Sequence, residues 1–196
     1  MLKRYVLYAM VLFLLAGCAS LSDQWERPLI LDNKTERDKR LAMKNWSLSG
    51  RLSLRDGKQS RMSLIKWRHN KALDIWVLSS LIGRTVAEIS HTGGVTYIKE
   101  PGKSKMGLSD QELAEAFGFV LPLQHLSYWV RGLVDDRELD EARMKKRYMI
   151  NGFEQNGWAV SLARYAREGE VVLPSKVVIS KGDLKIIIVV DKWQVE

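Results

Sequence analysis

The chain alternates between hydrophobic and polar residues from Trp46 onward. Leu48, Gly50, Leu52 and Leu54 fall on one side of this segment, while serine and arginine fill the positions between them. A period of two predicts a β-strand over residues 46–55 with one buried face and one wet face. Comparable segments, separated by turn sequences such as Asp56-Gly57, predict further strands at residues 60–68, 73–79, 84–91, 95–99, 147–154, 158–165, 177–180 and 184–193.

The middle of the chain has the period of a helix instead. Ser109 and Glu112 have the spacing of a capping box, and apolar residues recur behind them at helical spacing: Leu113, Ala116, Phe117, Val120 and Leu121. Pro122 then starts a second helix that ends near Gly132 and carries an apolar stripe of Leu123, Leu126, Trp129 and Val130. Both stripes would cover an apolar face of a sheet.

These elements predict one folded domain, mainly β with an α-helical cover, over residues 33–196. Strands on both sides of a helical insert form a single antiparallel sheet, and a sheet of this size curls with one face buried. We therefore expect a half-open antiparallel β-barrel with helices against its mouth. Residues 33–45 predict a helix with Asn33 as its cap, and the charged residues 135–145 predict a short helix or an exposed loop.

The first residues predict an exported, membrane-anchored protein. Lys3 and Arg4 precede an uncharged apolar run over residues 5–16, which is typical of a secretory signal peptide. The motif Leu15-Ala16-Gly17-Cys18 resembles the bacterial lipobox, in which the cysteine becomes the lipidated N-terminus. An ordinary signal peptide is the alternative. We expect residues 1–17 to be a lipoprotein signal peptide and residues 18–32 to be a lipidated tether, and Ala19-Ser20 implies sorting to the outer membrane in enteric-type bacteria.

Charge narrows the class of partner. The chain has 31 basic and 23 acidic residues, which gives a formal net charge of +8. Removal of the signal peptide with Lys3 and Arg4 would leave 29 basic and 23 acidic residues, a net charge of +6. An exported chain without a long basic run does not meet nucleic acid, so anionic lipid or an acidic protein is the expected partner. Arg51, Arg61 and Arg68 alternate with apolar positions and would either steer the approach of a partner from the rim or form a solubilising outer face.

Catalytic and metal chemistry is not indicated. One cysteine and three separated histidines do not supply a structural zinc site, and the phosphate-loop-like Gly102-Lys103-Ser104 has Tyr97 in place of the first glycine. The carboxylates of residues 135–141 alternate with Arg137 and Arg143, as on a solvated face, and the histidines are expected at the surface or at the edge of the core. We expect no cofactor and no enzymatic activity.

Seven tryptophans are the unusual feature of the composition. Five fall in predicted strands, at Trp46, Trp67, Trp76, Trp158 and Trp193, and Trp129 lies on the second covering helix. Packing in the hydrophobic core is enough to explain each tryptophan when it is considered alone. Around a curled sheet, the same rings could also line a large apolar cavity that holds an acyl chain.

Several collinear motifs resemble the LolB family of outer-membrane lipoprotein receptors. They run across nearly the whole mature chain and are Trp46-x-x-x-Gly50-Arg51-Leu52, Trp67, Leu81-Ile82-Gly83, Pro122-Leu123-x-x-Leu126-x-x-Trp129-Val130-x-Gly132, Gln155-x-Gly157-Trp158-x-Val160, Leu173-Pro174 and Trp193. The resemblance implies an eleven-stranded half-open barrel closed by helices. It also implies a monomer whose apolar interior accepts acylated lipoproteins from the periplasmic carrier LolA and delivers them to outer-membrane lipid without nucleotide. The cavity lining would include Trp46, Trp67, Trp76, Leu113, Phe117, Leu126, Trp129, Trp158 and Trp193.

The sequence Leu81-Ile82-Gly83 corresponds to a family loop that carries a protruding apolar side chain. Relatives usually have Pro-Leu-Gly there, so Ile82 takes the place of the leucine and Leu81 replaces the proline. Adjacent aliphatic residues alone would favour burial, whereas the resemblance implies an exposed tip that assists delivery into the membrane. The alternatives to a lipid-cargo receptor are a structural lipoprotein that anchors another envelope component and an acyl-ester hydrolase, and no nucleophile beside a histidine is visible for the latter.

Overall fold

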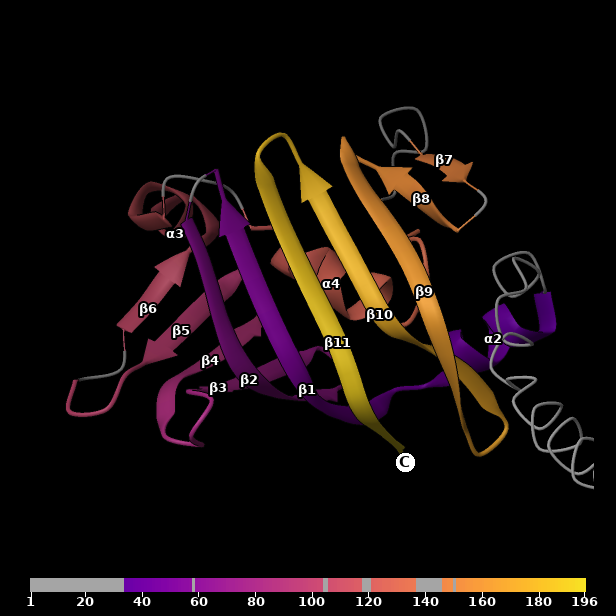
Figure 1. Cartoon of the computed structure of the whole chain (residues 1–196), viewed down its shortest axis with the longest axis horizontal. Helices are drawn as coiled ribbons and strands as arrows, with labels where there is room; N and C mark the ends of the chain where they lie inside the picture. The colour runs from indigo at the N-terminus through magenta and orange to yellow at the C-terminus, as the bar shows by residue number, and fades with distance from the viewer. Residues whose placement is uncertain (1–33, 58, 104–105, 118–120, 137–145, 150) are drawn as a thin grey trace, which may run out of the picture.

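A single antiparallel sheet of eleven strands forms the body of the protein (Figure 1). The computed structural model describes residues 34–57, 59–103, 106–117, 121–136, 146–149 and 151–196. The strands are β1 (Asn45–Asp56), β2 (Gln59–Asn70), β3 (Leu73–Ser79), β4 (Thr85–Thr92), β5 (Val95–Lys99), β6 (Met106–Ser109), β7 (Lys146–Met149), β8 (Gly152–Gln155), β9 (Trp158–Glu168), β10 (Val171–Lys181) and β11 (Leu184–Val195).

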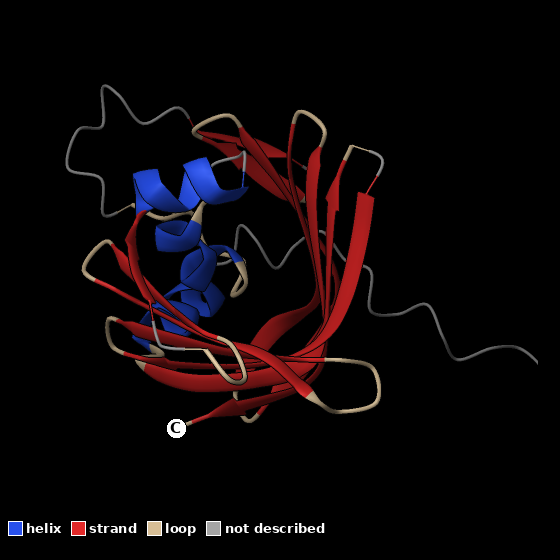
Figure 2. Ribbon diagram, turned by 90° about the vertical axis from the view of Figure 1, so that its left-hand side faces the viewer, coloured by secondary structure: helices blue, strands red, loops and turns tan. Residues whose placement is uncertain are grey.

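The sheet is curved but not closed. Its strand order is β6-β5-β4-β3-β2-β1-β11-β10-β9-β8-β7, so β1 pairs with β11 near the end of the chain, and β6 and β7 are the two edges. Figure 2 shows the sheet bending around the helices, which lie on its concave side. The half-open antiparallel barrel with a helical cover is thereby confirmed.

The alternation of the sequence decides which side chains point inward. Trp46 and Leu48 on β1 are buried, while Ser47 and Ser49 between them are half-buried on the outer face. The inner face continues across neighbouring strands, because Leu48 pairs with Trp67 on β2 and with Trp193 on β11. These residues belong to one hydrophobic core under the concave face.

Three described helices cover parts of the sheet: α2 (Lys34–Ala42), α3 (Asp110–Phe117) and α4 (Leu123–Trp129). α2 contacts β10, and α3 contacts β5 and β6. The Ser109 amide and hydroxyl each donate to Glu112 Oε2 at 2.8 Å, which confirms the capping box of α3. Gly132 ends the α4 segment as expected, since its amide donates to the Trp129 carbonyl at 2.9 Å. Among the described helices, none is long and apolar enough to cross a bilayer.

The sequence-based boundaries were wrong in four places. The segment 147–154 is a hairpin of β7 and β8 rather than one strand, and the helix expected up to Asn45 ends at Ala42. The prediction missed β6, a four-residue edge strand containing Gly107. β10 begins at Val171, not at 177, because Pro174 pairs only with β9 and no β11 carbonyl requires its missing N–H.

Candidate functional site

Six tryptophans lie buried on the inner side of the sheet. Trp46 is in edge-to-face contact with Trp67 and Trp193, at ring-centroid distances of 5.0 and 5.4 Å, and Trp67 lies 5.3 Å from Trp76. On the helical side Trp129 lies 6.2 Å from Trp158. All six rings belong to the same core, and we call this group the tryptophan floor.

Directed hydrogen bonds hold three of these six rings in place. Trp67 Nε1 donates to Asp74 Oδ1 at 2.7 Å, Trp129 Nε1 to Gln155 Oε1 at 2.8 Å, and Trp193 Nε1 to the Pro174 carbonyl at 3.0 Å. A buried indole that is both packed and hydrogen-bonded has one preferred orientation. The tryptophan floor is therefore a fixed, filled part of the interior.

The remaining candidate cavity residues are placed in the same region. Leu113 on α3 and Leu126 on α4 are buried in the common core. Phe117 is the last residue of α3, and its side chain lies outside the described part of the structure. The structure thus brings eight of the nine candidates into one cluster.

A second part of the inner face is less completely covered. Its side chains pack against the core but are only partly buried, and we call them the apolar lining: Leu52, Leu54, Leu78, Ile89, Ile98 and Leu108. The register continues the inner face from the floor to this lining, because Trp76 pairs with Ile89 and Ile89 pairs with Ile98. The interior therefore contains a closed floor and an apolar surface with room for further contacts.

The turn between β3 and β4 presents the two candidate delivery residues to solvent. Leu81 is 64% exposed and Ile82 is 91% exposed. The Ser80 amide donates to the Arg84 carbonyl and the Gly83 amide to the Ser80 carbonyl, each at 2.8 Å, while Gly83 has a φ of +85°. The turn is thus closed by its own backbone, and it begins two residues after Leu78 of the apolar lining.

The opposite end of the sheet holds a polar pocket of about 800 Å³. The three histidines His69, His91 and His125 all line it and are buried, although the sequence favoured the surface or the core edge. Each is fixed by a neighbour, since His69 and His125 stack on tryptophans and His91 Nδ1 lies 3.0 Å from Thr96 Oγ1. Thr96 is fully buried, so this hydroxyl is closed to a substrate.

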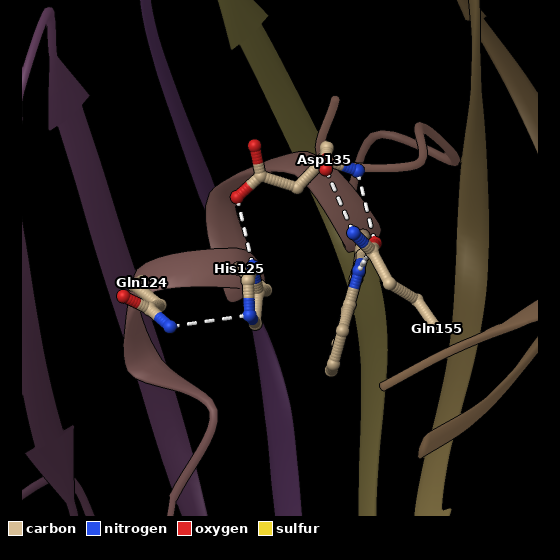
Figure 3. A network of polar contacts seen from close by, with 5 residues as sticks. Gln124, His125, Asp135 and Gln155 are labelled. Atoms are coloured by element: carbon tan, nitrogen blue, oxygen red, sulfur yellow. Dashed lines mark hydrogen bonds and ion pairs between the residues drawn. The ribbon is translucent and has the colours of Figure 1, made fainter. Parts of the chain in front are cut away.

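The prediction of a solvated acidic face is wrong at Asp135, while residues 137–141 of that face lie outside the described part of the structure. Only 2% of this residue is exposed, and its Oδ2 lies 2.8 Å from His125 Nδ1 (Figure 3). Gln155 donates to the Asp135 carbonyl at 2.7 Å and accepts from the Asp135 amide at 3.0 Å, besides accepting from Trp129. These contacts tie the segment after α4 to β8. The sequence analysis missed the role of Gln155, because the strand that it predicted ends at residue 154 and the short strand β8 is seen only in the structure.

The three arginines predicted at the rim do not lie together. Arg51 pairs in register with Leu64 and Val189 on the outer face and forms an ion pair with Asp191 at 2.9 Å. Arg68 also lies on the outer face, whereas Arg61 has the inward position opposite Leu54. A shared rim position is therefore wrong for Arg51 and Arg68. Within the described ranges there is no group of three or more His, Cys, Asp or Glu residues that could hold a metal ion.

Comparison with known proteins identifies the family. A family model described as "Outer membrane lipoprotein LolB" matches residues 44–193. The chain belongs to the LolB family. It is similar to the Outer-membrane lipoprotein LolB of Nitrosomonas europaea, with 31% identity over 192 residues covering 95% of this chain and 90% of the relative. The LolB protein of Pseudomonas aeruginosa is 27% identical over 196 residues, covering 97% and 96% of the two chains.

A solved structure supports the fold. A domain from Vibrio parahaemolyticus assigned to outer membrane lipoprotein sorting superposes with a TM-score of 0.50 at 9% identity, covering 85% of this chain and 92% of that one. Together with the LolB relatives, the family match makes this protein an outer-membrane lipoprotein of the lipoprotein localisation pathway, held in the outer membrane by lipid. Cys18, the signal peptide and the tether lie outside the described residues, so lipidation at Cys18 stays a prediction.

Proposed function

We propose that this protein receives triacylated lipoproteins from a LolA-like periplasmic carrier, holds their acyl chains against the apolar lining, and releases them into the inner leaflet of the outer membrane. The observation that carries this proposal is the apolar lining itself, a partly uncovered hydrophobic surface inside a curved sheet. The exposed pair Leu81 and Ile82 follows directly after a strand of that lining. The surface that holds the cargo and the turn that contacts the membrane would then lie next to each other.

The energetics of the cargo explain why a docked transfer is needed. A triacylated cargo carries roughly forty-five methylenes, and at about 0.8 kcal/mol for each methylene exposed to water, free diffusion would face a barrier of tens of kcal/mol. An apolar surface that meets the carrier's cavity removes most of this barrier. Direction then follows if each later site binds the acyl chains more favourably, and no nucleotide or chemical step is required.

The filled floor and the open lining would have different tasks. The tryptophan floor is closely packed, and three of its rings are hydrogen-bonded, so it stabilises the fold and bounds the site. The apolar lining has the accessible surface that acyl chains need. Because α3 contacts β5 and β6 beside Ile98 and Leu108, displacement of α3 would widen access to this surface.

Two adjacent residues of β3 provide a matched test. Leu78 belongs to the inner lining, and Val77 is half-buried but points to the outer face of the same strand. A photoreactive amino acid is introduced at each position in turn, and carrier loaded with a triacylated lipoprotein is added. We expect a cargo adduct from position 78 and none from position 77.

The outcomes separate the candidate functions. An adduct from position 78 that requires the acyl chains of the cargo supports the receptor. Absence of an adduct from a well-folded position 78 variant, with cargo remaining on the carrier, would refute the proposal and favour a structural envelope lipoprotein that anchors a protein partner.

A further inference from the structure

The outer face of the sheet carries a basic groove over β1, β2 and β11. Lys66 on β2 and Lys192 on β11 both pair with Ser49 of β1, so the two lysines flank one small residue. One step along β1, Ser47 pairs with Arg68. A hollow of about 320 Å³ lies between these side chains, and Ile75 and Val77 complete its wall. We call Lys66, Arg68 and Lys192 above Ser47 and Ser49 the basic groove.

The three cations of the basic groove form no ion pair within the described part of the protein. Arg51 has Asp191 as its partner at 2.9 Å, but Lys66, Arg68 and Lys192 have no carboxylate partner among the described residues. Further along the same face Arg55 pairs directly with Lys185 across the strands. Like charges in direct cross-strand register are destabilising unless something compensates them. This arrangement indicates an external anion.

Exposed apolar side chains continue the same face toward the turn between β3 and β4. Met62 has an outward position on β2 opposite Ser53 and is 59% exposed. Two residues further along β2, Leu64 pairs with Ser79, the residue that leads into the turn with Leu81 and Ile82. Cations beside exposed aliphatic side chains are typical of a surface that lies on a membrane, with the cations at the headgroups and the apolar groups below them.

We propose that the basic groove binds the phosphate groups of anionic phospholipids, so that the outer face of β1, β2 and β11 lies on the membrane in which the protein is anchored. Lysine, arginine and serine hydroxyl groups all donate to phosphate oxygens. Figure 1 looks onto this outer face, with α4 behind the sheet. The lipid anchor keeps the protein at the bilayer, which favours a lipid partner over an acidic protein. The inference rests on the proposed function only for the role of the turn.

A labelling experiment on the lipidated mature protein tests the groove directly. The protein is reconstituted into vesicles of phosphatidylcholine alone or of phosphatidylcholine with phosphatidylglycerol, and a water-soluble amine reagent modifies its lysines. We expect Lys66 and Lys192 to react with the reagent about fivefold more slowly on the anionic vesicles than on the neutral ones. This factor corresponds to the attraction of about 1 kcal/mol between one cation and an anionic membrane surface. The difference in labelling rate should shrink as the salt concentration rises. Lys34 on α2 and Lys99 on β5 are exposed internal controls that should not change.

Three results would overturn the inference. The first is equal labelling of Lys66 and Lys192 on both kinds of vesicle, and the second is an equal decrease in labelling at Lys34 and Lys99. The third is protection of Lys66 and Lys192 from the reagent only when carrier is added, which would make this face a protein-docking surface. Because the labelling needs neither carrier nor cargo, it is readable even if the receptor function fails.

A second measurement uses matched variants. We expect Lys66→Gln, Arg68→Gln and Lys192→Gln together to abolish the difference in cargo release between anionic and neutral vesicles while loading from the carrier is unchanged. The control removes the same charge elsewhere with Lys34→Gln, Lys99→Gln and Arg167→Gln, and should behave as the parent. A groove variant that keeps the full response to anionic lipid would contradict the proposal.

Discussion

The exposed turn allows the membrane step to be separated from folding and from cargo receipt. Ile82 is 91% exposed, and the turn is closed by backbone hydrogen bonds that a new side chain leaves intact. Ile82→Glu should therefore change the free energy of unfolding by no more than about 0.5 kcal/mol, as at other surface positions. A buried position would instead lose several kcal/mol, because an unpaired carboxylate would be desolvated.

The same substitution should strongly weaken contact with a bilayer. Burial of an isoleucine side chain in an apolar medium contributes about 2 kcal/mol, and that contribution is lost. An acidic side chain at membrane depth adds about 2.5 kcal/mol of cost. The sum exceeds 4 kcal/mol, which corresponds to roughly a thousandfold loss if the side chain inserts fully.

The assay follows a labelled lipoprotein from carrier to receptor and from receptor to floated vesicles. We expect Ile82→Glu to accept cargo at the parent rate and to release it into vesicles far more slowly. Ile82→Leu is the matched control, since it keeps the apolar volume, and should deliver normally. Normal delivery by a folded Ile82→Glu protein would refute the role given to this turn.

Three further predictions concern the framework of the site. Gly50→Ala should destabilise the protein by on the order of 3 kcal/mol in denaturant unfolding, because its Cβ would lie 2.0 Å from the Val189 carbonyl oxygen; an unchanged midpoint would contradict this backbone approach. Gln155→Leu removes three buried hydrogen bonds and should cost about 3 kcal/mol in the same measurement, and a neutral effect would show that these bonds are dispensable. The Ser109 amide and hydroxyl lower the pKa of Glu112 below its ordinary 4.5, so the cap of α3 should persist at neutral pH and be lost only as pH falls through that lowered pKa. An NMR titration of Glu112 checks this, and Ser109→Ala should raise the pKa; an unmoved titration would count against the cap.

Much of the fold was predictable because local patterns and the final burial agree. The alternation from Trp46 to Leu54 correctly separates the inner from the outer face of β1, and the capping box at Ser109 forms as its spacing indicates. The predicted ends of strands were wrong where pairing with a strand distant in the sequence decides them. Pro174 can sit in β10 only because β11 pairs with that strand from Lys176 onward, which no local signal reveals.

The polar half of the site was the least predictable part. Asp135 lies beside other charges in the sequence and so resembles a solvated residue, yet it is buried because His125 and Gln155 converge on it from distant segments. The exposure of Ile82 is likewise not decided by local sequence, since adjacent aliphatic residues suit a buried crossing equally well. Only the path of the turn beyond the sheet distinguishes the two cases.

In the proposed function, acyl chains pass from a carrier onto the apolar lining of this protein. A direct measurement mixes the lipidated protein in vesicles with carrier that holds a radiolabelled triacylated lipoprotein, without nucleotide, and follows cross-linking from position 78 together with transfer of the label over time. We predict transient cargo adducts from position 78, followed by appearance of the lipoprotein in the bilayer. Transfer to the vesicles with no adduct from position 78, or equal transfer by vesicles that lack the protein, would refute passage of the cargo through the apolar lining.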